Sequence, residues 1–344
     1  MKKELRNMLS PSECRKKLVL EAFPRRTLSF YRYVRIADPQ AMRDLLFLEW
    51  SALGVLGRIY VSQEGINAQL NVPESNLQYF IQNLDSRTEF KNMPMKYGVE
   101  EGESFIKLTI KVKNFIVADG LPAGSYDISD VGTHLTPDEF DRALEEKDTL
   151  VVDVRNHYES RIGHFEKAFF PDVDTFREAL PAVKEYLKGK EDKKVLLYCT
   201  GGIRCEKASA YLKANGFKNV HQLYGGIINY AHETRNRGVA PHFLGKNFVF
   251  DERIGERITP DVLSKCDQCG KSCDDYTNCK NAICNLLFIQ CADCRERMSN
   301  CCTDECRYVA SLPQEKQRSL RKGQPSHTYD RFLSRQRPSC TLFQ

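Results

Sequence analysis

Ten of the fourteen cysteines in this 344-residue chain lie between positions 266 and 306, and this cluster constrains the fold more than any other feature. A segment of about forty residues buries little core of its own, so bound metal would stabilise its fold. In a reducing compartment such a cluster indicates metal ligands before it indicates disulfides. The segment contains no histidine, so its sites would be all-sulfur.

Two Cys-x-x-Cys pairs predict how the cluster is divided. Cys266 with Cys269 and Cys291 with Cys294 have the spacing of zinc knuckles, and together they predict one tetrahedral site. A second site would draw four ligands, with two to spare, from Cys273, Cys279, Cys284, Cys301, Cys302 and Cys306. We predict structural zinc, because no spacing here matches the ferredoxin runs. An iron–sulfur cluster and disulfides remain as alternatives, although nothing in the sequence suggests export.

Upstream of the cysteines, two patterns of strands and helices divide the chain. The first follows the order βαββαβ, which predicts a ferredoxin-like α+β domain. The second alternates helices with continuously apolar strands, which predicts an α/β domain with a parallel sheet. Strands of the first domain are expected at 28–36, 58–62, 67–72 and 105–112. The expected boundaries are 25–118 for the ferredoxin-like domain, 133–240 for the parallel-sheet domain, 260–310 for the cysteine-rich segment and 311–344 for a basic tail.

The charge of the chain is concentrated at its end. The formal net charge is +5, and the tail 311–344 carries seven Lys or Arg and two Asp or Glu, so the rest is neutral overall. This excludes a uniformly polycationic protein and leaves a local anion-binding arm. No apolar run approaches the roughly 18 residues of a membrane span, so we expect a cytoplasmic protein with no membrane partner.

A cysteine at the end of a predicted strand carries the clearest chemical signal. The apolar run 195–198 leads into Cys199, a glycine-rich turn and the start of a helix. Successive backbone N–H groups can curl around the sulfur, the helix N-terminus adds partial positive charge, and Arg204 adds a full one. All three favour thiolate, so we predict a reactive Cys199 in an anion cradle. The cradle residues are Thr200, Gly201, Gly202, Ile203 and Arg204.

This six-residue loop, Cys199 to Arg204, resembles the active-site loop of the rhodanese family. Three further stretches match that family in order: Val152-Asp153-Val154-Arg155 with Glu159, Gly163-His164-Phe165 with Ala168, and Leu223-Tyr224-Gly225-Gly226-Ile227 with Tyr230. The resemblance covers about 137–240 and implies sulfur chemistry, with Cys199 as the residue that would carry a persulfide. We place Asp153 and Arg155 with the anion cradle.

Across its full length the chain resembles the rhodanese-related tRNA uridine hydroxylases. The resemblance rests on the domain order and on three stretches: Ser62-Gln63-Glu64-Gly65-Ile66-Asn67-Ala68, the run from Cys199 to Ser209, and Cys291-x-x-Cys294 with Cys301-Cys302. It implies 5-hydroxylation of the wobble uridine of tRNA with molecular oxygen as co-substrate. Cys205 would resolve an oxidised or persulfidated Cys199, or pack as a second helix cysteine. A thiol or a sulfur relay would supply the reductant.

Two other functions remain open at this level. One is a sulfurtransferase that carries a persulfide on Cys199. The other is a zinc-stabilised RNA-binding adaptor without catalysis. His157, Glu159 and His164 superficially resemble an iron triad, but two of them already belong to the rhodanese matches, so we do not predict iron. The sequence shows no dinucleotide-binding glycine motif after a strand.

Two segments are candidates for RNA contact. In the predicted strand 28–36, Phe30 and Arg32 share one face and Tyr31 and Tyr33 the other, and aromatic residues on a sheet can stack bases. The simpler interpretation, that one face packs on helices and the other is solvated, is preferred. The tail is the better phosphate-binding candidate, or else a solvated basic end. Its cations are Lys316, Arg318, Arg321, Lys322, Arg331, Arg335 and Arg337.

Overall fold

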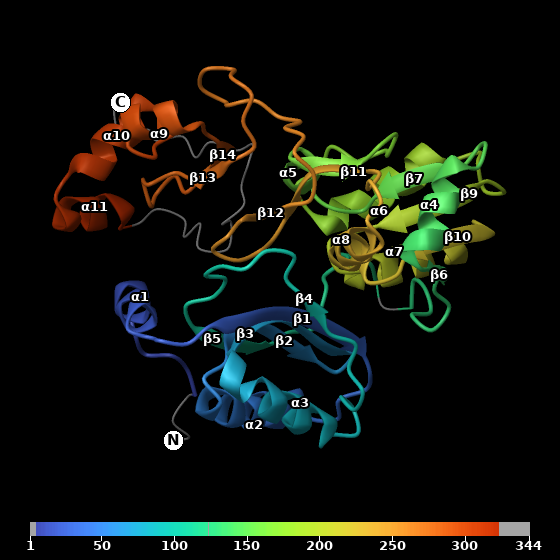
Figure 1. Cartoon of the computed structure of the whole chain (residues 1–344), viewed down its shortest axis with the longest axis horizontal. Coiled ribbons are helices and arrows are strands. Elements are labelled where there is room, and N and C mark those ends of the chain that lie inside the picture. Colours follow the sequence, from blue (N-terminus) through green and yellow to red (C-terminus); the bar gives the residue numbers. More distant parts are fainter. Residues whose placement is uncertain (1–4, 123, 323–344) are drawn as a thin grey trace.

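The computed structural model describes residues 5–122 and 124–322 and arranges them in three regions (Figure 1). An N-terminal α+β domain lies at the bottom of the view, a central α/β domain at the right, and the cysteine-rich region at the upper left. The mixed α/β fold predicted from the sequence is confirmed. No helix in the described part of the chain is long and apolar enough to cross a membrane.

The N-terminal domain is a five-stranded sheet with helices on one face (Figure 1). In spatial order its strands are β4 (Lys96–Tyr97), β1 (Arg25–Tyr33), β3 (Gly65–Pro73), β2 (Leu56–Ser62) and β5 (Leu108–Val112). The helices are α2 (Pro39–Ala52) and α3 (Leu77–Asp85), which follows the short turn η1 (Glu74–Asn76). Alternate residues of the strands, such as Phe30, pack with Trp50 and Phe80 in the core under the helices. The other face of the sheet is left for contact with the rest of the molecule.

The last strand of this domain differs from the prediction. The strand that completes the βαββαβ order is β4, which has only two residues and pairs with β1. The predicted strand 105–112 begins at Leu108 and lies on the opposite edge, parallel to β2. A two-residue strand carries no alternation that a sequence pattern could reveal. The N-terminal residues also contain a helix, α1 (Pro11–Val19), which begins with a capping box between Ser10 and Glu13.

The central domain is a parallel four-stranded sheet with helices on both faces. Its strands are, in spatial order, β6 (Thr133–Leu135), β10 (Asn219–Leu223), β9 (Lys194–Tyr198) and β7 (Leu150–Asp153). Its helices are α4 (Pro137–Glu145), α5 (His157–Ser160), α6 (Phe176–Leu187), α7 (Ile203–Ala214) and α8 (Gly226–Arg237). Along β9, Val195 and Leu197 join the core under α6 and α7, while Leu196 and Tyr198 join the core under α4 and α8. This burial on both sides explains why the strand is continuously apolar.

A small antiparallel sheet leads from the central domain to the cysteine-rich region. It consists of β8 (Gly163–Phe165), β11 (Phe243–Phe248) and β12 (Gly255–Arg257). The cysteine-rich region contains β13 (Tyr276–Asn278), β14 (Leu287–Ile289), α9 (Ala292–Arg297) and α10 (Asp304–Ser311). Helix α11 (Gln314–Arg321) follows, and it holds Lys316, Arg318 and Arg321 of the predicted basic tail. The tail residues Arg331, Arg335 and Arg337 lie outside the described residues.

One buried lysine ties the N-terminal domain to the central one. Lys207 of α7 is 2% exposed, and its Nζ lies 3.1 Å from a carboxylate oxygen of Glu64 and 3.2 Å from one of Asp119. It also donates to the backbone carbonyl of Val117 at 2.9 Å. A buried cation needs such partners, so these contacts fix how the two domains meet.

Candidate active site and metal centres

Cys199 directly follows the last residue of β9 and begins the loop that leads into α7. The backbone N–H of Gly202 donates to its Sγ at 3.1 Å, so the loop curls around the sulfur. Gly202 has a φ of +101°, in the region that favours glycine, and a Cβ there would stand 2.8 Å from the hydroxyl of Tyr31. The N-terminal domain therefore touches the loop directly.

The environment of the Cys199 sulfur stabilises its charged form. Burial alone would raise the pKa of this thiol. The hydrogen bond from the Cys205 thiol, the charge of Arg204 and the backbone N–H groups of Arg204 and Gly202 outweigh it, and they lower the pKa of Cys199 to about 5. Burial and the neighbouring Cys199 raise the pKa of Cys205, so Cys205 keeps its proton and donates a hydrogen bond to the thiolate. Cys199 is thus a thiolate at neutral pH.

Helix α8 fastens the loop from the other side. The backbone N–H of Ile227 donates to the carbonyl of Cys199 at 3.0 Å, and that of Ile228 donates to the carbonyl of Thr200 at 3.2 Å. Gly226 has a φ of +68°, and a Cβ there would lie 2.6 Å from both of those carbonyl oxygens. Glycine is therefore required where the two elements approach each other.

Arg204 is held by a partner that the sequence reasoning did not assign to the site. Its guanidinium forms two hydrogen bonds with the fully buried Glu159 of α5, at 2.5 and 2.8 Å. The Thr200 hydroxyl also donates to Glu159, at 3.2 Å. This fork-on-fork pairing fixes the guanidinium beside the loop. The available signal was the position of Glu159 within the rhodanese-like stretch.

Asp153 and Arg155 do not line the cradle, which corrects their predicted place. Both side chains are completely buried and pair with each other at 2.7 Å. Asp153 also accepts from the hydroxyl of Ser160, and Arg155 donates to the carbonyl of Gly163. A buried charge is stable only when it is paired in this way. These contacts hold together the segment that connects β7 to β8.

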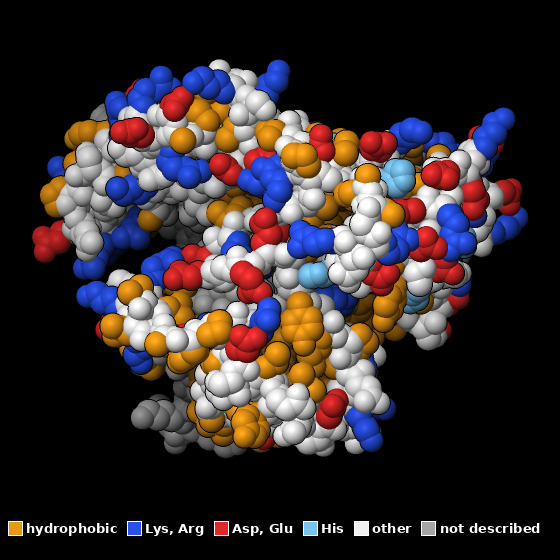
Figure 2. Space-filling view, viewed as in Figure 1, with side chains coloured by type: hydrophobic (Ala, Val, Ile, Leu, Met, Phe, Trp, Pro, Cys, Tyr) orange, Lys and Arg blue, Asp and Glu red, His pale blue; other side chains and the backbone are white. Residues whose placement is uncertain are grey.

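A cavity of about 1370 Å³ opens in front of the loop. Its walls include Cys199, Thr200, Gly201, Ile203 and Arg204 from the loop and the helix-free face of the N-terminal sheet. Nine lysines or arginines and three acidic residues line it. The cations are Arg15, Arg58, Lys96, Lys107, Lys111, Lys113, Arg177, Arg204 and Arg253. Figure 2 shows the surface hollowed between α1 and the cysteine-rich region, with Lys and Arg side chains gathered along the recess.

The strand considered for RNA contact packs within the protein. Phe30 faces the core, as its alternation predicts. On the opposite face, the Tyr31 hydroxyl donates to Glu206 at 2.8 Å and that of Tyr33 donates to the carbonyl of Ile203 at 3.3 Å. Arg32 donates to backbone carbonyls of the same domain. The cations that line the cavity come instead from other elements, and among them the sequence reasoning singled out only Arg204.

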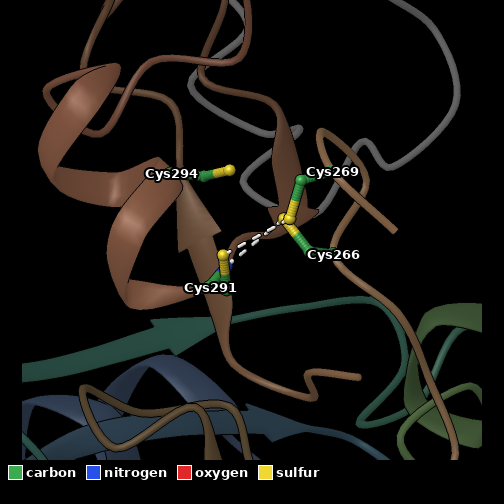
Figure 3. A group of neighbouring side chains, drawn as sticks. All are labelled: Cys266, Cys269, Cys291 and Cys294. Atoms are coloured by element: carbon green, nitrogen blue, oxygen red, sulfur yellow. Dashed lines mark hydrogen bonds between the residues drawn. The ribbon is translucent and has the colours of Figure 1, made fainter. Parts of the chain in front are cut away.

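Four cysteines converge at the start of α9 (Figure 3). The sulfurs of Cys266, Cys269, Cys291 and Cys294 all lie within 4.8 Å of one another, and those of Cys269 and Cys291 are 3.6 Å apart. A tetrahedral zinc ion with Zn–S bonds of about 2.3 Å sets its sulfurs roughly 3.8 Å apart. The group therefore fits one ion.

A second group gathers Cys279, Cys284, Cys302 and Cys306, again within 4.8 Å. Two of its sulfur pairs are 3.6 and 3.7 Å apart. Both groups are more compact than an iron–sulfur cluster requires, because a cluster places its cysteines on different iron atoms. Cys273 and Cys301 belong to neither group. All described cysteines are free thiols, so the disulfide alternative has no support in this part of the chain.

A thiolate cradled by backbone amides between a parallel strand and a helix defines a rhodanese-type domain. Residues 136–233 match the rhodanese-like domain, residues 25–116 the UPF0176 acylphosphatase like domain, and residues 244–307 the family described as Rhodanase C-terminal.

Full-length relatives identify the family more narrowly. A tRNA uridine(34) hydroxylase of Leptospira interrogans is 53% identical over 97% of this chain and 91% of its own length. Proteins of the same name from Cronobacter sakazakii and Escherichia fergusonii are 47% and 48% identical, over 98% and 93% of this chain and 97% and 92% of their own lengths. This chain belongs to the family of tRNA uridine(34) hydroxylases.

Proposed function

We propose that this enzyme hydroxylates the wobble uridine of tRNA at C5, with molecular oxygen as co-substrate and Cys199 as the reactive group. The observation that carries the proposal is the position of a stabilised thiolate at the wall of a large basic cavity. Together with the family membership, it combines a nucleophile with an anion-binding surface. A sulfurtransferase or a non-catalytic adaptor would account for only one of these two features.

The size of the cavity suits a segment of RNA. Small-molecule pockets measure roughly 300–1,000 Å³, and this cavity is larger, at about 1370 Å³. Wobble position 34 lies in the single-stranded anticodon loop, where a base can be turned out at little cost. The turned-out base would reach Cys199 while its neighbours remain in the wider part of the cavity.

The free face of the N-terminal sheet would bind the phosphates of that loop. Lys111 lies in β5, and Lys107 and Lys113 lie directly before and after this strand at positions of the same alternation, so their side chains share this face beside Arg58 of β2. Cations that neutralise phosphates supply affinity with little sequence preference. Helix α11 adds Lys316, Arg318 and Arg321 on the cysteine-rich side.

Analysis of nucleosides tests the function. In a strain that lacks this gene, a plasmid copy should restore 5-hydroxyuridine-derived modification at position 34, and Cys199→Ser should not. Growth under ¹⁸O₂ should place the heavy isotope in the new hydroxyl group. If Cys199→Ser restores the modification, Cys199 is not required for the reaction. If the oxygen of the hydroxyl group comes from water, molecular oxygen is not the co-substrate.

Cys205 is our candidate for the resolving thiol. It already hydrogen-bonds to Cys199, so no rearrangement of the helix is needed to bring the sulfurs together. If peroxide converts Cys199 to a sulfenic acid, the Cys205 sulfur attacks it, the S–O bond breaks, and water leaves as the disulfide forms. An external thiol would return the two electrons. After peroxide treatment the native protein should lose two hydrogens in mass, and Cys205→Ser should gain one oxygen instead.

We further propose that each cysteine group holds one structural zinc ion. The positive charge of the metal would bind four thiolates. The metal would take no part in the reaction. Backbone N–H groups of Cys291, Gln268 and Cys269 outweigh burial and lower the pKa of Cys266 to about 6, as suits a thiolate ligand. We place the protein in the cytoplasm, where its proposed tRNA substrate is found.

A further inference from the structure

We propose that Lys96 of the N-terminal domain binds the target base, donating a hydrogen bond from Nζ to the 4-carbonyl oxygen of uracil beside Cys199. This inference rests on the proposed function and deepens it, because it names the residue that selects uracil. No sequence pattern pointed to Lys96. The two-residue strand that carries it was not predicted.

The placement of Lys96 follows from strand pairing. β4 pairs with β1 so that Lys96 lies opposite Ser29, and both line the cavity. The ammonium lies over the ring of Tyr31, 4.6 Å from its centroid. The hydroxyl of Tyr31 in turn stands against Gly202 of the Cys199 loop. Lys96 is thus one aromatic ring away from the loop that holds the thiolate.

Among the lysines that line the cavity, Lys96 is the partly buried one, whereas Lys107, Lys111 and Lys113 are exposed. Arg15 pairs with Glu252, Arg204 with Glu159, and Arg253 with Asp251. For Lys96, the described residues provide the face of Tyr31 and no carboxylate within 4 Å. Desolvation therefore lowers the pKa of Lys96 to about 8, although the charges of Cys199 and Glu206 act to raise it. A cation kept in such a place gains when a ligand supplies the missing acceptor.

The position of Lys96 across the sheet favours a base over a phosphate as that acceptor. β4 and β5 are the opposite edges of the five-stranded sheet, so Lys96 and Lys111 are separated by four strand spacings, about 19 Å. The exposed Lys107, Lys111 and Lys113 in and beside β5 suit the phosphates of neighbouring nucleotides. Lys96 lies at the edge beside Cys199, where the base itself must come to react.

The chemistry of uracil identifies the oxygen. The 4-carbonyl is bonded to C5, the carbon that is hydroxylated, whereas the 2-carbonyl lies across the ring. A donor held beside Cys199 therefore meets O4. A lysine ammonium has three donors and no acceptor, so it pairs with the 4-carbonyl of uracil and opposes the 4-amino group of cytosine. Lys96 would thus distinguish uridine from cytidine.

Binding of anticodon stem-loops to the full-length protein tests this without oxygen or reductant. Loops with uridine or cytidine at position 34 serve as probes. The native protein should prefer the uridine loop by about tenfold, the value of one hydrogen bond to a charged donor. Lys96→Met should bind both loops equally, at the level of the native protein with the cytidine loop. Lys96→Arg, which keeps the charge, should retain the preference.

The pH dependence and a matched control exclude a structural effect. The preference of the native protein should fall as pH rises through about 8, while that of Lys96→Arg should persist. Lys91→Met, an exposed lysine of the same domain outside the cavity, should behave as the native protein. A uridine preference that survives in Lys96→Met overturns the inference and leaves the function intact. Native protein that binds neither loop and hydroxylates no tRNA overturns the function as well.

Discussion

Two regions of this molecule place cysteine sulfur in different surroundings. In the Cys199 loop, peptide N–H groups, a neighbouring thiol and a guanidinium surround a single sulfur. In the cysteine-rich region, two sets of four sulfurs converge within 4.8 Å, an arrangement that suits the proposed zinc ions. A sulfur charged by hydrogen bonds keeps a lone pair for reaction, whereas a sulfur charged by a metal uses its lone pair in ligation. On the proposed function, the same side chain would serve catalysis in one region and folding in the other.

Loss of a metal ligand should have the largest effect. Cys294→Ser removes a buried sulfur from the first group, and structural zinc in small domains binds with about 10–16 kcal/mol of apparent free energy. Zinc should fall from two ions per chain to one, and calorimetry should show the cysteine-rich region unfolding at a lower temperature. Cys273→Ser, also buried but outside both groups, is the control and should keep two ions. If Cys294→Ser still binds two zinc ions per chain, Cys294 is not a zinc ligand.

Alkylation should separate the two kinds of thiolate next. With a pKa of about 5, Cys199 is mostly thiolate at pH 6, so it should react roughly tenfold faster than an ordinary thiol of pKa 8.5, because its larger thiolate fraction outweighs the lower nucleophilicity of a thiolate of low pKa. Its rate should be flat above pH 6 and fall as pH drops through 5. The ligand cysteines should react only after a chelator removes the metal. Mass spectrometry of iodoacetamide-treated peptides measures both, and a Cys199 rate that keeps rising to pH 9 would contradict the electrostatic account.

The same shift has a consequence for stability. Folding lowers the pKa of Cys199, so its thiolate stabilises the folded state above the ordinary thiol pKa. That contribution is lost as pH falls through about 5. A Cys199→Ser protein should therefore lose less stability than the native one between pH 8 and pH 4.

Gly226→Ala should sharpen the role of backbone geometry in the loop. The added Cβ would meet the carbonyls of Cys199 and Thr200, and the positive φ adds strain, so we expect the free energy of unfolding to fall by about 2 kcal/mol. Displacing the loop should also raise the pKa of Cys199. Gly238→Ala is a matched control at the other end of α8, because its φ is +66° and nothing lies within 4 Å. If both variants leave alkylation of Cys199 unchanged, the α8 contact does not shape the cradle.

Arg204→Lys should have the smallest effect. Lysine keeps the charge but cannot form the two-pronged pair with Glu159, so the cation would be held less firmly beside the sulfur. The pH midpoint of Cys199 alkylation should rise from about 5 to about 6. A midpoint equal to that of the native protein would show that the pairing of Arg204 with Glu159 is not needed to stabilise the thiolate.

What the sequence could reveal depended on whether the signal was local. The Cys199 loop was predicted because strand, glycines and helix start are neighbours in the chain, and the grouping expected from the two Cys-x-x-Cys pairs follows from short spacing. The fold class was predicted for the same reason. The apolar run of β9 and the capping box that begins α4 are local patterns.

The rest depended on contacts between distant residues. Lys96 reaches the loop only because β4 pairs with β1 and the sheet then docks on α7. Glu159 meets Arg204 across 45 positions of sequence, and no pattern specifies that pairing. Asp153 and Arg155 were placed with the cradle together with the rhodanese-like stretch that contains them, whereas they pair with each other in the interior. The membership of the second cysteine group also required the folded chain.

The buried contact of Lys207 with Glu64 and Asp119 bears on how such a molecule can be altered. A catalytic unit cut out at the domain boundary would expose an uncompensated ammonium on one side and two carboxylates on the other. A chimaera that takes its two halves from different parents needs this triad from one parent. The two domains should therefore be exchanged together rather than separately.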